Sequence, residues 1–218
     1  MKNTRKKRRK PQIVLIHGGE AFKTRKEYVR FLKNRKVSVE KWRGWSGEYL
    51  DEKLGGKFQI IRPRMPLQDN ARYGDWEIHF ERYLPHLRDG VILIGSSLGG
   101  VFLAQYLSRH AFPRNIAGAF LVAPPFDSNA GGDEFAGGFP LKGSLRLFEK
   151  QAKNLHLFFS RDDAVVPPAH AEKYRAKLPH AKITIYKSKR GHFRVATFPE
   201  IVKAIKAAAE QPRKRPSS

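Results

Sequence analysis

The pentapeptide GSSLG, residues 95–99, follows an apolar run and precedes a segment with helical patterning. It matches the pattern G-x-S-x-G around Ser97, whereas the same frame around Ser96 would need glycine where Ile94 and Leu98 stand. A serine in this pattern is typical of a tight strand-to-helix turn that lifts the hydroxyl above a sheet. Glycines are needed on both sides because side chains there would collide with neighbouring backbone. Ser97 is therefore the candidate nucleophile, and the chemistry it predicts is acyl transfer.

A serine hydroxyl needs a general base and an orienting acid, and this motif predicts the chain order serine, acid, histidine. Two later apolar runs are followed by SRDDAVVPPAH and by KSKRGHF. Both segments are expected to lie at the carboxyl ends of strands, where the sites of open parallel sheets gather. We predict His192 as the base and Asp163 as the acid. Asp162, the neighbouring residue, and Asp127, after an earlier run, are the alternatives for the acid.

The oxyanion of a tetrahedral intermediate needs backbone N–H donors. We expect one donor to be Leu98, whose N–H would lie at the N-terminus of the helix after the turn. The second should come from HGGEAF, after the first apolar run, and we select the Gly19 N–H because Gly18 and Gly19 allow the backbone to approach substrate closely. His17 is expected to shape this loop. Glu20 is a carboxylate beside the predicted site with no assigned role.

Elements that could position these residues follow from the alternation of short apolar runs with amphipathic ones. That alternation predicts an α/β fold, a three-layer α/β/α sandwich with a mostly parallel sheet of about six strands. The expected strands are 12–16, 57–61, 91–95, 117–123, 155–160 and 182–187. The expected helices are 24–36, 74–87, 98–110, 168–178 and 198–210.

Two segments do not fit this alternation. Residues 37–56 are expected to hold a short helix. Residues 124–143, rich in glycine and proline, leave room only for a loop, for which we predict a small lid with glycine hinges at 131–132 and 137–138.

Length and composition indicate one compact domain at 11–210, because 218 residues with 40% hydrophobic side chains suit a single core. The formal net charge is +23, and ten of these charges lie in two basic tails, 1–10 and 211–218, which we predict to be disordered. The +13 that remains on the body favours at most weak, non-specific contact with polyanions such as nucleic acid.

The absence of cysteine excludes disulfides, thiolate metal sites and a cysteine nucleophile, and it favours a reducing compartment. No run approaches the roughly 20 apolar residues of a membrane span. We therefore expect a cytoplasmic protein. The sequence contains no metal-binding or dinucleotide-binding pattern, so no cofactor and no metal is predicted.

Four motifs occur in an order and spacing that resemble the α/β-hydrolase superfamily: HGG (17–19), GSSLGG (95–100), DAVVP (163–167) and GHF (191–193). The likeness spans nearly the whole chain. The small size also resembles the compact, capless serine hydrolases of the retinoblastoma-binding-protein-nine type. One departure is Ser96, where many relatives carry histidine before the nucleophile.

By this resemblance, Ser97 would be the nucleophile, Asp163 the acid and His192 the base, with oxyanion donors at Gly19 and Leu98. The expected function is hydrolysis of a small carboxylic ester through an acyl-enzyme, with a small-molecule acyl substrate. Thioesters, amides, lactones and short peptides stay open, as does acyl transfer to an acceptor other than water. The alternative from another class is a catalytically inactive hydrolase fold that binds nucleic acid or an acidic partner through its basic surface.

Overall fold

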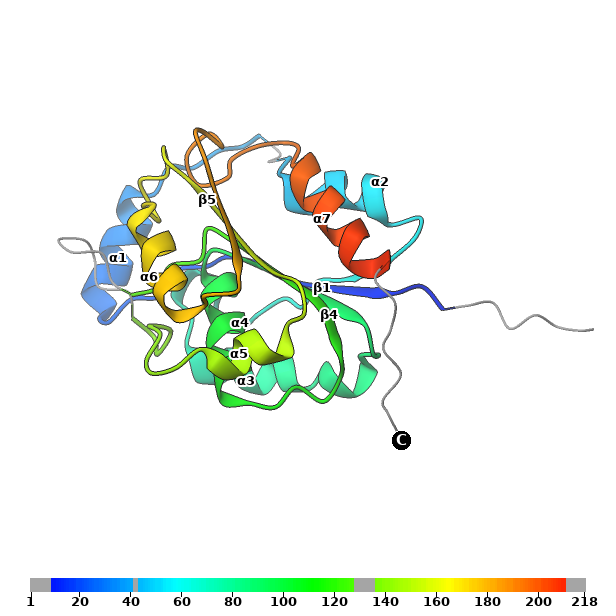
Figure 1. Cartoon of the computed structure of the whole chain (residues 1–218). Helices are drawn as coiled ribbons and strands as arrows, with labels where there is room; N and C mark the ends of the chain where they lie inside the picture. Colours follow the sequence, from blue (N-terminus) through cyan, green and yellow to red (C-terminus); the bar gives the residue numbers. More distant parts are fainter. Residues whose placement is uncertain (1–8, 41–42, 128–135, 211–218) are drawn as a thin grey trace, which may run out of the picture.

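The structure is a computed structural model that describes residues 9–40, 43–127 and 136–210 (Figure 1). Its centre is a six-stranded sheet of order β2-β1-β3-β4-β5-β6 in which every neighbouring pair is parallel. The strands are β1 (Gln12–Ile16), β2 (Gln59–Ile61), β3 (Val91–Ser96), β4 (Ile116–Val122), β5 (Leu155–Ser160) and β6 (Lys182–Tyr186). The strand order reverses between β1 and β3, and in open parallel sheets the sites lie at the carboxyl edge near such a reversal.

Helices cover both faces of the sheet, as predicted (Figure 1). On one face, α4 packs on β1, β3 and β4 and contacts α3 and α5, while α7 covers β4 from the other face beside α2. The helices are α1 (Arg25–Asn34), α2 (Leu50–Leu54), α3 (Tyr73–Glu81), α4 (Leu98–Arg109), α5 (Arg146–Gln151), α6 (Ala169–Lys177) and α7 (Pro199–Glu210). The near-continuous apolar runs of β1, β4 and β5 are explained by this arrangement, since these strands are buried on both faces.

The predicted elements agree with the observed ones to within two residues at most ends, with one clear exception. The predicted helix 74–87 ends at Glu81 and is followed by a separate 3-10 turn, Leu84–His86, which contains a proline. Proline cannot donate the backbone hydrogen bond that a continuing helix requires. A capping box begins the first helix, because Thr24 Oγ1 accepts from Glu27 N–H and the Glu27 carboxylate accepts from Thr24 N–H, both at 3.2 Å.

The short helix expected within 37–56 is observed as two joined pieces, the turn η1 (Trp45–Tyr49) and α2. Trp45 is buried and packs edge-on against Phe198, with the two ring centroids 5.5 Å apart. The helix α5 was not predicted. It has six residues and follows an irregular segment. Only one of its residues, Phe148, is buried, so its sequence shows little helical periodicity.

Of the two predicted hinges in the loop after β4, residues 131–132 lie outside the described residues. The other pair, 137–138, is anchored rather than free. Its carbonyls accept hydrogen bonds from Tyr73 N–H at 2.7 Å and from Gln105 Nε2 at 3.0 Å. The next residue, Phe139, is fully buried. This end of the loop is therefore fixed to α3 and α4.

Most of the two predicted basic tails, 1–8 and 211–218, also lies outside the described residues. Within the part that the structure covers, no helix is both long enough and apolar enough to cross a membrane.

Candidate active site

Ser97 occupies the turn between β3 and α4 in a strained conformation, with φ 51° and ψ −120°. Its backbone N–H donates to the Val122 carbonyl at 2.8 Å, which ties the turn to β4. A Cβ atom on Gly95 would lie 2.5 Å from the Gly99 carbonyl oxygen and 2.6 Å from Gly100 Cα. These distances are too short for any side chain, so glycine at position 95 is a steric requirement of the turn. A Cβ on Gly99 would lie 2.5 Å from the His17 carbonyl oxygen, so this second glycine lets α4 approach the end of β1.

The loop after β1 lies against this turn. A Cβ on Gly18 would be 3.2 Å from Ser97 Cβ, and one on Gly19 would be 3.2 Å from Leu98 Cδ2. Leu98 begins α4, and the first N–H groups of a helix have no partner within it. Among the described residues, neither the Gly19 nor the Leu98 N–H makes a hydrogen bond. The two predicted oxyanion donors thus lie side by side, Gly19 in the loop after β1 and Leu98 at the start of α4. Both N–H groups are available to a substrate oxygen.

His17 holds the loop after β1 in place, in agreement with the role predicted for it. Met65 N–H donates to His17 Nε2 at 3.0 Å, so the ring proton must be on Nδ1, which lies 2.6 Å from the Gly18 carbonyl oxygen and donates to it. The ring also packs edge-on against Trp76.

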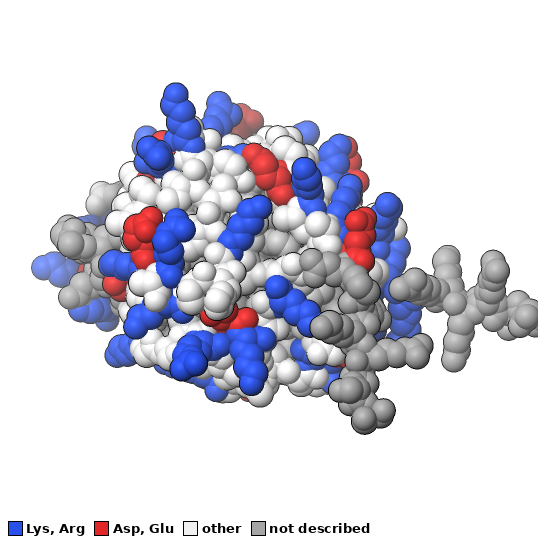
Figure 2. Space-filling view, in the orientation of Figure 1, with Lys and Arg blue, Asp and Glu red and all other residues white. Residues whose placement is uncertain are grey.

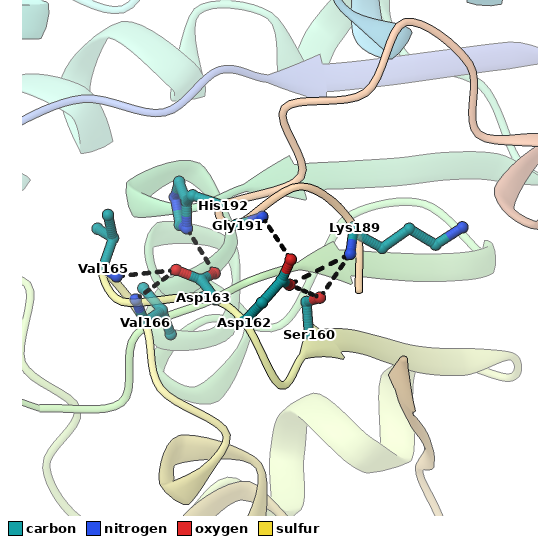
Figure 3. Close-up of polar contacts among 8 residues, drawn as sticks. All are labelled: Ser160, Asp162, Asp163, Val165, Val166, Lys189, Gly191 and His192. Carbon is teal, nitrogen blue, oxygen red and sulfur yellow. Dashed lines mark hydrogen bonds and ion pairs between the residues drawn. The ribbon is translucent and has the colours of Figure 1, made fainter. Parts of the chain in front are cut away.

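His192 and Asp163 are brought together by the loops that follow β6 and β5 (Figure 3). His192 Nδ1 lies 2.7 Å from Asp163 Oδ2, and Asp163 Oδ1 accepts from the N–H groups of Val165 and Val166, both at 2.9 Å. The Asp163 side chain is fully buried, whereas the imidazole is one-fifth exposed. A carboxylate acceptor at Nδ1 places the ring proton there and leaves the Nε2 lone pair to act as a base.

The imidazole and the serine turn share one pocket, since His192 and Ser96 both line it. Within the described part of the chain, Ser97 Oγ makes no hydrogen bond to His192 or to another residue. Nucleophile–base hydrogen bonds are often long in unliganded enzymes and shorten when substrate binds.

Neither of the two alternative acids, Asp127 and Asp162, is hydrogen-bonded to His192 among the described residues. Asp127 is bonded to Lys173 Nζ at 2.6 and 2.8 Å, on the exposed surface beside α6. Asp162 points away from the imidazole and accepts hydrogen bonds from Ser160 Oγ and from the N–H groups of Lys189 and Gly191 (Figure 3). It also accepts one from Ser188 Oγ. These bonds, the one from Ser160 first, hold the pKa of Asp162 well below its ordinary value.

Glu20 lies at the edge of the site, and its surroundings change its acidity. Partial burial raises the pKa of its carboxyl above the ordinary value, an effect that the nearby His192 opposes. Asp69 raises this pKa further and Arg35 lowers it. Glu20 is thus a carboxylate within the electrostatic range of the predicted base. In the ranges that the structure describes, no group of three or more His, Asp or Glu side chains is arranged to hold a metal ion.

The family model described as serine hydrolase matches residues 41–203, well over half of the chain. None of the curated proteins matches the sequence. Many solved structures share the fold, among them the ydeN gene product from B. subtilis, at 19% identity and a TM-score of 0.71, covering 91% of this chain and 98% of that one.

Two further structural neighbours are more distant. MenH from S. aureus has 10% identity and a TM-score of 0.59, covering 94% of this chain and 95% of that one. A pyrethroid hydrolase from Sphingobium faniae JZ-2 has 14% identity and a TM-score of 0.54, and the match covers 93% of this chain and 98% of that one. The likeness to the retinoblastoma-binding-protein-nine type stays a prediction. The extent of the family match, on a parallel sheet with helices on both sides, means that the chain belongs to the serine hydrolase family within the α/β-hydrolase superfamily.

Proposed function

We propose that this protein hydrolyses small carboxylic esters through an acyl-enzyme formed on Ser97. His192 acts as general base and Asp163 as the acid that orients it, and the N–H groups of Gly19 and Leu98 form the oxyanion hole. The observation that supports this most is the 2.7 Å hydrogen bond between His192 Nδ1 and the fully buried Asp163, at the same sheet edge as the strained turn of Ser97.

In the first half of the reaction, Ser97 Oγ attacks the ester carbonyl carbon while its proton passes to His192 Nε2. The carbonyl electron pair moves to oxygen, where the two backbone N–H groups stabilise it. Losing one such donor costs about 3 kcal/mol of activation free energy in comparable sites. Collapse of the intermediate breaks the bond to the leaving alcohol, which takes the proton from His192.

In the second half, water attacks the acyl-enzyme and gives its proton to His192. The carbonyl is re-formed, the bond to Ser97 Oγ breaks, and the proton returns to Ser97. The product acid leaves and the free enzyme is restored. Thioesters and amides would pass through the same acyl-enzyme. The preference for small esters is inferred from chain length, because the stretch between β4 and α5 is too short for a cap domain.

The decisive test is intact-mass analysis after treatment with a fluorophosphonate. We expect a single adduct on the native protein and on the matched control Ser96→Ala, no adduct on Ser97→Ala, and a strongly slowed reaction on His192→Ala. An adduct that persists on Ser97→Ala would disprove the assignment of the nucleophile. No adduct on folded native protein would instead support the binding-module alternative, in which the fold has no activated serine.

A further inference from the structure

A pocket of about 530 Å³ opens beside His192. Its walls come from segments far apart in the sequence: the stretch after α1, the start of η1, the end of β3 and the residues that follow His192. Trp45 and Phe193 are aromatic parts of the wall and are themselves almost completely buried. This volume suits a group of small-molecule size.

Two cationic residues line this pocket, Lys36 from the segment after α1 and Arg194 from the segment after His192. In the part of the chain that the structure describes, neither makes a hydrogen bond or an ion pair. Other cations around the site are engaged: Arg35 pairs with Asp69 at 3.0 Å and Lys189 with Glu200 at 2.7 Å. The cations at the pocket are therefore available to a ligand.

One carboxylate, that of Glu40, also lines the pocket. Two cations face one acid, and the guanidinium of Arg194 offers the planar pair of donors that matches a carboxylate. The field of the whole molecule acts in the same direction, because the formal net charge is +23. Figure 2 shows lysine and arginine side chains spread over the visible face with fewer acids between them. An anion is thus favoured over a cation.

The position of the pocket connects this charge to the reaction. Its wall includes His192 and Ser96, the residue before Ser97, so a ligand group held there would lie on the His192 side of the serine turn.

We propose that this pocket binds an anionic group of the substrate through Lys36 and Arg194, so that the preferred substrates are esters that carry an ionised carboxylate in addition to the ester group. This proposal rests on the proposed function and narrows its substrate class to monoesters of dicarboxylic acids.

The test compares two esters of equal chain length, mono-4-nitrophenyl glutarate, which is anionic, and 4-nitrophenyl valerate, which is neutral. We expect the native enzyme to prefer the glutarate in kcat/KM by roughly tenfold or more, as charge-assisted hydrogen bonds do in comparable sites. Lys36→Met and Arg194→Met should each reduce this preference several-fold, because glutarate hydrolysis falls more than valerate hydrolysis, and Glu40→Gln should increase it. The matched control is Lys33→Met on α1, which removes the same charge from a residue outside this pocket and should leave the preference unchanged.

Equal rates for the two esters in the native enzyme would overturn the proposal, as would a preference that survives in the Lys36→Met/Arg194→Met double variant. A separate measurement keeps the proposal testable if neither ester is hydrolysed. Titration with glutarate, followed by tryptophan fluorescence because Trp45 lines the pocket, should saturate in the native protein at a lower concentration than in the double variant. Identical curves would refute anion binding here, whereas failed fluorophosphonate labelling would refute only the proposed function.

Discussion

The Asp162 carboxylate accepts a 3.0 Å hydrogen bond from the N–H of Gly191, the residue directly before His192 (Figure 3). The turn that carries the histidine is strained, with positive φ at Arg190, Gly191 and Phe193. Such conformations persist only where surrounding contacts hold them. The two adjacent carboxylates after β5 therefore have separate roles, since Asp162 holds the backbone of the turn and Asp163 holds the imidazole.

Asp162→Asn should weaken this hold, because an amide offers one acceptor oxygen where the carboxylate uses two. We expect the imidazole to be misplaced and kcat/KM to fall roughly 10- to 100-fold, the cost of a small misplacement of a catalytic group. The measurement is ester hydrolysis together with the rate of fluorophosphonate labelling of Ser97. The matched control is Asp127→Asn, which removes a carboxylate paired with Lys173 on the surface and should leave both rates near native. Equal rates for the two variants would show that Asp162 does not position the base.

Asp163→Asn should reduce kcat by a different route. The N–H groups of Val165 and Val166 require an oxygen acceptor, so the amide oxygen of asparagine would face them and its NH₂ group would face His192 Nδ1. Nδ1 would then have to accept, which places the ring proton on Nε2 and removes the base. We expect a loss in kcat on the order of 10⁴-fold with the fold intact. A loss of less than tenfold, measured with circular dichroism as the folding control, would argue against this role.

The residues proposed for the chemistry could be predicted because each stands in a short local pattern. Gly95 reflects contacts within five residues of chain, and the strand-end position of Asp163 and His192 follows from the parallel topology. Gly99 also belongs to the local motif, although a Cβ there would meet the backbone carbonyl of His17 at 2.5 Å, at the end of β1. The sequence favours Asp163 over Asp162 only by its position before the VVP segment. Only the folded loops show that one faces the turn backbone and the other faces the imidazole.

Features formed by distant segments could not be predicted. Lys36 and Arg194 are separated by most of the chain, and neither belongs to a recognisable motif, so their meeting at one pocket depends on tertiary structure alone. The same holds for the anchoring of residues 137–138, whose glycines suggest freedom in the sequence but whose carbonyls are bound by α3 and α4.

Gly95→Ala tests the steric basis of the serine turn. The added Cβ would meet the Gly99 carbonyl oxygen at 2.5 Å, and backbone cannot move away as a flexible side chain can. We expect the free energy of unfolding to fall by about 2–3 kcal/mol, as for other overpacked cores, and activity to be lost. Gly74→Ala in α3 is the control, because nothing lies within 4 Å of its added Cβ, and it should be neutral or stabilise by up to about 1 kcal/mol. Denaturant unfolding of both variants decides the matter, and equal midpoints would contradict the prediction.

Acid sensitivity should depend in part on His156, a buried histidine on β5 that hydrogen-bonds Thr184 Oγ1 at 2.8 Å. Burial, and secondly the charge of Lys182, lowers its pKa from 6.5 to about 4. Between these two values the unfolded chain binds a proton at this residue that the folded protein does not bind. The free energy of unfolding therefore falls as the pH decreases through this window, by up to about 3 kcal/mol from this group.

His156→Gln keeps a hydrogen-bonding side chain that does not titrate, so it should remove this component of the pH dependence. The measurement is urea unfolding of the native protein and the variant from pH 8 to pH 4.5. Above pH 7 the difference in unfolding free energy between the two proteins should be constant. Below pH 6.5 the native curve should fall more steeply than that of the variant. Parallel curves across the whole range would mean that His156 has the same pKa in the folded and the unfolded protein, so that burial does not lower it.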